Sequence, residues 1–60
     1  MQHHGDVIFE FIQLGAYIKV TAVDAQTGLE VSSVGAAGTP QHVLQKNALR
    51  KLRHVQNKKK

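Results

Sequence analysis

The pattern of hydrophobic and polar positions predicts three β-strands near the start of the chain. Apolar and polar residues alternate through 18–22 and again through 29–32, as they do in half-buried strands whose successive side chains point to opposite faces. The earlier stretch 7–14 is apolar at most positions on both faces, which is typical of a strand covered on both sides. We therefore expect strands over residues 7–14, 16–23 and 29–34.

The connections between these strands contain residues suited to tight turns. Gly15 can adopt a positive φ between the first two strands, and Gly28 can do so before the third. Asp24 can accept hydrogen bonds from backbone amides two or three residues later. The sequence therefore predicts short antiparallel hairpins, followed by a flexible crossover of small residues at 35–38.

The last third of the chain has the periodicity of an amphipathic helix. Thr39 is a good N-cap, and Pro40 suits the first helical position, where its missing N–H is no loss. Apolar residues then recur every three or four positions and form one stripe that faces the sheet. The residues of this stripe are Leu44, Ala48, Leu52 and Val55. The predicted fold class is α+β: a three-stranded antiparallel β-meander with one C-terminal α-helix packed on one face (βββα).

We expect one domain over residues 6–55, with a disordered N-terminal tail at 1–5 and a basic disordered C-terminal tail at 56–60. Sixty residues are close to the smallest size at which a chain folds alone, and there is no cysteine to add a disulfide. Self-association is a natural way to gain further burial. Because no apolar run approaches ~20 residues and no signal-peptide pattern is present, we expect no membrane span and a cytoplasmic location.

A single helix can cover only one face of a three-stranded sheet. We assign to the helix-covered core the strand residues Phe9, Phe11, Ile18, Val20, Leu29 and Val31. The other face also keeps apolar residues, namely Ile8, Ile12, Tyr17, Val23 and Val34. Such a patch usually marks an interaction surface, so we expect it to bind a second copy in a homodimer, by faces or by edges, or another protein. The alternative is that a terminal segment folds over it.

Positive charge is concentrated in the second half of the chain. All four acids precede residue 31, seven of the eight lysines and arginines follow it, and the net charge is +4. The cations of the helix and tail are Lys46, Arg50, Lys51, Arg53, His54, Lys58, Lys59 and Lys60. They can neutralise several phosphates, so nonspecific nucleic-acid binding is our alternative function. The competing explanation is that they complement the helix dipole and favour solubility.

No motif in the sequence names a reaction. There is no local Ser/His/Asp set and no phosphate-binding loop, and four histidines without cysteine do not form a zinc signature. We interpret Glu10 and Glu30 as cross-strand partners of Lys19 rather than as an acid/base couple. We therefore expect no enzyme activity, no catalytic residue, no metal, no cofactor and no small-molecule substrate.

Four segments of the chain together carry a resemblance to a known family. They are Phe9-Glu10-Phe11, the stretch 15–24, the stretch 27–31, and Ala48-Leu49-Arg50-Lys51-Leu52. They resemble a family of short, uncharacterised bacterial proteins, a domain of unknown function, over about residues 7–53. The resemblance implies a freestanding single-domain bacterial protein without an established activity, and it transfers no catalytic residue.

Overall fold

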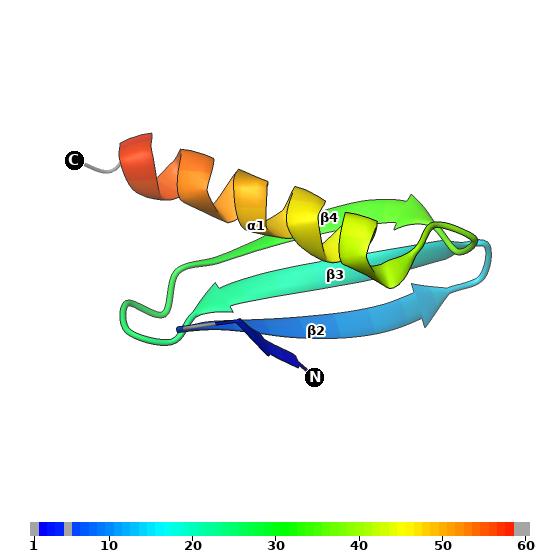
Figure 1. Ribbon diagram of the computed structural model, residues 1–60, viewed down its shortest axis with the longest axis horizontal. Helices are drawn as coiled ribbons and strands as arrows, with labels where there is room; N and C mark the ends of the chain where they lie inside the picture. The colour runs from blue at the N-terminus through cyan, green and yellow to red at the C-terminus, as the bar shows by residue number, and fades with distance from the viewer. Residues whose placement is uncertain (1, 5, 59–60) are drawn as a thin grey trace.

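Within residues 2–4 and 6–58, which the computed structural model describes together with the side chains of residues 6–57, the chain forms an antiparallel sheet and one helix (Figure 1). The elements are β1 (Gln2–His4), β2 (Val7–Leu14), β3 (Tyr17–Asp24), β4 (Glu30–Ala36) and α1 (Gln41–Lys58). Strands that follow one another in the sequence are also neighbours in the sheet. The meander β2–β3–β4 followed by α1 confirms the predicted βββα fold.

Both strand connections use the predicted glycines. Gly15 has φ +64° between β2 and β3, and Gly28 has φ +77° before β4. The Asp24 carboxylate accepts hydrogen bonds from the backbone N–H groups of Gln26 at 2.8 Å and Thr27 at 3.3 Å. The side chain thus holds the turn closed where the backbone has no strand partner, as the sequence predicted.

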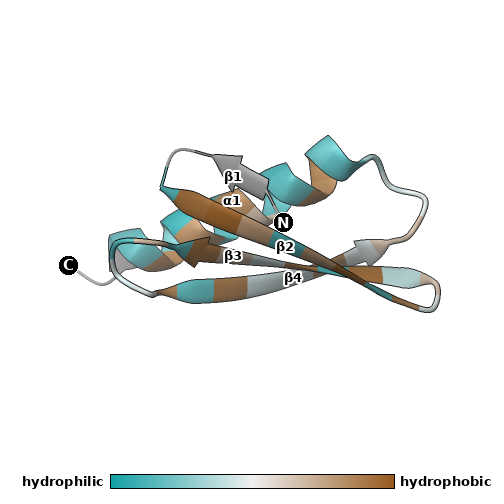
Figure 2. Cartoon of the chain, turned by 90° about the horizontal axis from the view of Figure 1, so that it is seen from below, coloured by the Kyte–Doolittle hydropathy of each residue, from teal (hydrophilic) through white to brown (hydrophobic). Residues whose placement is uncertain are grey.

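The core lies between α1 and the face of the sheet that was predicted to be covered by the helix. Phe9, Val20 and Leu52 are the largest fully buried side chains. The other buried apolar residues are Val7, Ala22, Leu44 and Ala48, and the half-buried ones packed against this cluster are Phe11, Ile18, Leu29, Val31 and Leu49. Apolar and polar segments alternate along the strands and along the helix (Figure 2). The buried cluster contains the residues of the predicted face, so that core face is confirmed.

The helix runs antiparallel to β4 and packs over β3 and β4 (Figure 1). The carbonyl of Pro40 accepts hydrogen bonds from the backbone N–H groups of Val43 and Leu44, so the first helical turn forms beside the end of β4. At the other end of α1, the Gln56 side-chain amide donates to the carboxylate of Asp24. The same carboxylate therefore closes the β3–β4 turn and fixes the far end of the helix.

The predicted crossover at 35–38 begins later than expected, because Gly35 and Ala36 belong to β4. Leu44 reaches down to Gly35 so closely that a β-carbon there would collide with the leucine side chain. A residue without a side chain is typical of a strand position that another element approaches closely. The glycine therefore lies at a close contact with the helix, at a position where the sequence predicted only a flexible crossover.

The two predicted tails also differ from the structure where it describes them. Residues 2–4 form the short strand β1, which pairs with the edge of β2 and satisfies backbone groups there. The helix continues to Lys58 rather than ending at residue 55. Residues 1, 5, 59 and 60 of these predicted tails lie outside the described residues. No helix in the described part of the chain is long and apolar enough to cross a membrane.

Candidate interaction surfaces

The face of the sheet opposite α1, which we call the open face, carries an exposed apolar cluster at one end. The two rows of paired residues nearest the β2–β3 hairpin are Ile12–Lys19–Val34 and Leu14–Tyr17–Ala36. Their large apolar side chains, which we call the hairpin-end patch, are exposed to 41% (Ile12), 53% (Leu14), 58% (Tyr17) and 61% (Val34). No other large apolar side chain among residues 6–57 is exposed to this degree.

A polar row separates this patch from the rest of the open face. Glu10, Thr21 and Ser32 pair across the three strands. The hydroxyl oxygens of Thr21 and Ser32 lie 3.2 Å apart in a hydrogen bond, and Thr21 is only 8% exposed. The central hydroxyl is therefore satisfied within the sheet, which makes this row a fixed polar boundary.

The residues predicted for a partner interface do not all lie together. Three of the five belong to the hairpin-end patch: Ile12, Tyr17 and Val34. Ile8 and Val23 pair with each other beyond the polar row, and both are half-buried. Leu14 also belongs to the patch; the sequence placed it in the first strand, but the predicted interface did not include it. The signal was present, because the alternation of β2 continues through residue 14.

A ridge of exposed basic residues runs along the outer side of α1, away from the sheet. Its members, which we call the basic ridge, are Lys46, Arg50, Arg53 and His54. Together with Leu49 and Asn57 they line a shallow groove. The Arg50 guanidinium donates to the side-chain oxygen of Asn47 at 2.9 Å, one turn earlier, and this contact orients it along the helix surface.

Lys51 stands apart from this ridge, although it belonged to the same predicted set. Its ammonium group donates a hydrogen bond to the backbone carbonyl of Ser32 at 2.6 Å, at the outer edge of β4. The backbone of Lys58 ends the helix. Its side chain, and Lys59 and Lys60, lie outside the described residues. The structure thus brings together four of the eight predicted cations.

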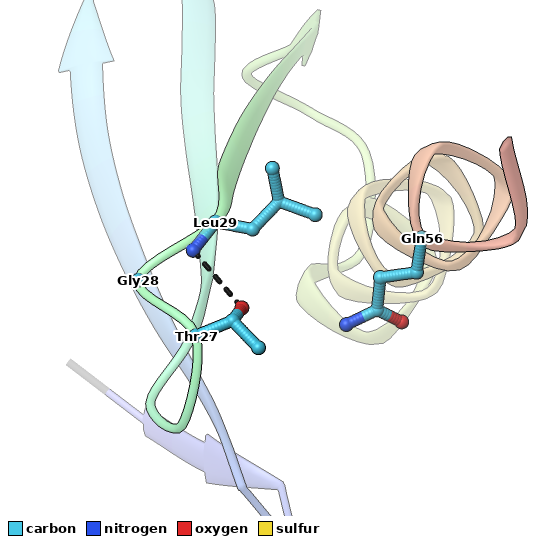
Figure 3. Close-up of a pocket in the computed structure, with 4 residues that line it drawn as sticks. All are labelled: Thr27, Gly28, Leu29 and Gln56. Carbon is cyan, nitrogen blue, oxygen red and sulfur yellow. Dashed lines mark hydrogen bonds between the residues drawn. The ribbon is translucent and has the colours of Figure 1, made fainter. Parts of the chain in front are cut away.

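A cleft separates the β3–β4 turn from the end of α1. It has a volume of about 540 Å³ and is lined by Thr27, Gly28, Leu29 and Gln56 (Figure 3). The Thr27 hydroxyl accepts a hydrogen bond from the Leu29 backbone N–H at 3.2 Å, which fixes that wall. Of the four lining residues, Thr27 and Gln56 have polar side chains and none has a titratable group. Across residues whose side chains are described, no three of the types His, Cys, Asp and Glu gather to hold a metal ion.

The chain belongs to the family described as Domain of unknown function (DUF6898), which matches residues 4–59 of the 60-residue chain. This confirms the family resemblance, while the bacterial origin stays a prediction. Comparisons with curated proteins and with solved structures give no match.

Proposed function

We propose that this protein is a non-catalytic self-association module of the cytoplasm, in which the open face of one copy covers the hairpin-end patch of a second copy. The observation that carries this proposal is the gathering of every strongly exposed large apolar side chain of residues 6–57 into two adjacent rows. Exposed apolar surface that is contiguous rather than scattered is typical of an interaction site.

A second copy suits the open face because this face carries both positive and negative side chains. Each can pair with a side chain of opposite charge on an identical face. Along β2, β3 and β4 the open face carries one cation, Lys19, and two anions, Glu10 and Glu30. A like face therefore supplies carboxylates for the lysine. The two anions also disfavour a negatively charged lipid surface as the occupant of this face.

The area of the face is of the right order for such a contact. A standard protein interface buries ~800 Å² on each partner, about a fifth of the 4179 Å² surface of this domain. A contact of standard size would therefore cover a large share of this small domain. Burial at the interface also adds to a core that has only seven buried apolar residues within 6–57.

Sedimentation equilibrium tests the proposal with two variants that carry the same charge at adjacent positions. Ile12→Lys places a cation in the patch, whereas Gln13→Lys places it at an exposed position on the opposite face of β2. We expect Ile12→Lys to lower the average mass at a given concentration and Gln13→Lys to leave it unchanged. A wild type that stays monomeric up to about 1 mM, where binding amounts to only ~4 kcal/mol, overturns the proposal.

The second candidate function is nonspecific nucleic-acid binding through the basic ridge. The helix contains no acidic residue from 41 to 58, and its cations begin at Lys46, well before the last turn. A dipole effect is confined to the last turn, so it does not account for Lys46 or Arg50. A row of exposed cations of this kind suits contact with successive phosphates, with an affinity that falls as salt rises.

A further inference from the structure

The outer edge of β4 is the free edge of the sheet beyond β3, and the hydrogen bonds at its two ends show which of its backbone groups point outward. The Asp24 N–H donates to the Leu29 carbonyl, and the Ala37 N–H donates to the Ala16 carbonyl, both at 2.8–2.9 Å. Between these bonds the register is continuous, and residues of an antiparallel strand alternate between facing their partner and facing away. Odd-numbered residues of β4 therefore face β3. The even-numbered ones present their N–H and C=O groups at the edge: Glu30, Ser32, Val34 and Ala36.

These outward groups are not equally open to a further strand. The Ser32 carbonyl accepts the hydrogen bond from Lys51, and the Ala36 carbonyl accepts one from the Thr39 N–H at 3.0 Å. Glu30 places a charge at the beginning of the edge, a common device against edge pairing. Among the residues that the structure describes, Val34 keeps both backbone groups without a partner, beside a neutral, 61% exposed side chain.

We infer that the β4 edge is a strand-pairing site whose occupant is β4 of a second copy, antiparallel and centred on Val34. In that register the N–H of each Val34 meets the C=O of the other, which makes the contact two-fold and self-complementary. Ser32 lies opposite the partner's Ala36, and Glu30 lies opposite the partner's Gly38. The two glutamates are thus kept at opposite ends, and the residues that face each other are small.

This contact uses the backbone edge of β4 rather than the side chains of the open face, and it does not depend on the proposed function. The two contacts are compatible, because the edge uses the backbone groups of Val34 whereas the hairpin-end patch uses its side chain. Pairing at Val34 places the patches of two copies side by side on one continuous sheet, with both helices on its other face. Two such sheets can then stack through their open faces, which gives a four-chain assembly with the helices outside.

Amide hydrogen exchange followed by NMR tests the edge directly. In a monomer the Val34 N–H has no acceptor and exchanges fast, whereas the amides of Ser33 and Gly35, which face β3, are protected. We expect the hydrogen-exchange rate of the Val34 amide to fall at least tenfold as the protein concentration rises from about 10 μM to about 1 mM. This fall should be the same in the wild type and in Ile12→Lys. Val34→Pro, which removes the N–H at an edge position that tolerates proline, should abolish the edge contact, whereas Val34→Thr, which keeps the N–H, should retain it.

The outcomes separate the two contacts. A mass that rises with concentration while the Val34 amide stays fast overturns edge pairing and leaves the proposed function in place. A Val34 amide that slows while Ile12→Lys leaves the mass unchanged supports edge pairing and counts against the face contact. A monomer with a fast Val34 amide at every concentration overturns both. If Val34→Pro fails to fold, the wild-type exchange data still decide.

Discussion

Leu44 fills the space above Gly35 that a β-carbon at that position would need. The leucine belongs to the first turns of α1 and is only 5% exposed, so little room remains for it to move aside. This contact sets how closely the helix approaches β4. It also explains why β4 continues through a glycine that, by propensity alone, marks a loop.

Gly35→Ala should therefore destabilise the fold by about 1–3 kcal/mol, the usual cost of forcing extra volume into a packed site. Urea denaturation followed by circular dichroism measures the change in the free energy of unfolding. Gly38→Ala is the matched control, because no atom lies within 4 Å of the added methyl group and Gly38 has no positive φ. We expect that control to be neutral or slightly stabilising. Equal free energies of unfolding for the two variants would show that the contact between Leu44 and Gly35 does not set the distance between α1 and β4.

The parts of the fold that the sequence predicted are those set by local rules. The alternation in β2–β4, the turn chemistry of Asp24 and Gly28, and the apolar stripe of α1 each depend on residues close together in the chain. Gly35 was misassigned because its place in β4 depends on pairing with Ile18 of β3, and its close contact with Leu44 comes from a third element, α1. Tertiary contacts of that kind leave no local signature.

The candidate surfaces were predicted less completely than the fold. Alternation alone assigned Ile8 and Ile12 to one face without showing that a polar row lies between them, because this requires the register of three strands. Similarly, helical spacing placed Lys51 at the border of the outer helix face, and the predicted binding set included it without showing what it contacts. Its bond to the Ser32 carbonyl depends on the position of β4 beside the helix, which the sequence does not encode locally.

Removing the Asp24 carboxylate is predicted to lower the free energy of unfolding more than removing any one of its hydrogen bonds. It accepts from two turn amides and from the Gln56 side chain, so Asp24→Ala removes all three contacts. We expect a loss of about 1–3 kcal/mol for Asp24→Ala and of about 0.5–1.5 kcal/mol for Gln56→Ala, which removes only the helix contact. Denaturant titrations of both single variants and the double variant give the coupling between them. An Asp24→Ala variant as stable as Gln56→Ala would contradict a role for the turn contacts.

If the protein binds nucleic acid through the basic ridge, reversing a charge on the ridge should weaken binding more than reversing a charge on the open face. Arg50→Glu changes the basic ridge, whereas Lys19→Glu makes the same charge change on the open face. If the ridge binds phosphates, Arg50→Glu should weaken binding to a short single strand about tenfold or more at low salt and reduce the salt slope by about one. Fluorescence anisotropy over a salt series measures both quantities. Equal effects of the two variants would indicate that net charge, rather than the ridge, governs binding.

Lys51 is predicted to limit pairing at the β4 edge. Its hydrogen bond occupies the Ser32 carbonyl, one step along the edge from Val34. Lys51→Met keeps an apolar stem but cannot donate, so the carbonyl becomes open to the Ala36 N–H of a second copy. Because the contact is two-fold, each dimer would gain two hydrogen bonds worth ~1 kcal/mol each, and association should tighten roughly 5- to 30-fold. Sedimentation equilibrium measures this change, with Lys46→Met on the outer helix face as the control for lost charge. Equal association constants for the two variants would mean that the Lys51 contact does not restrict the edge.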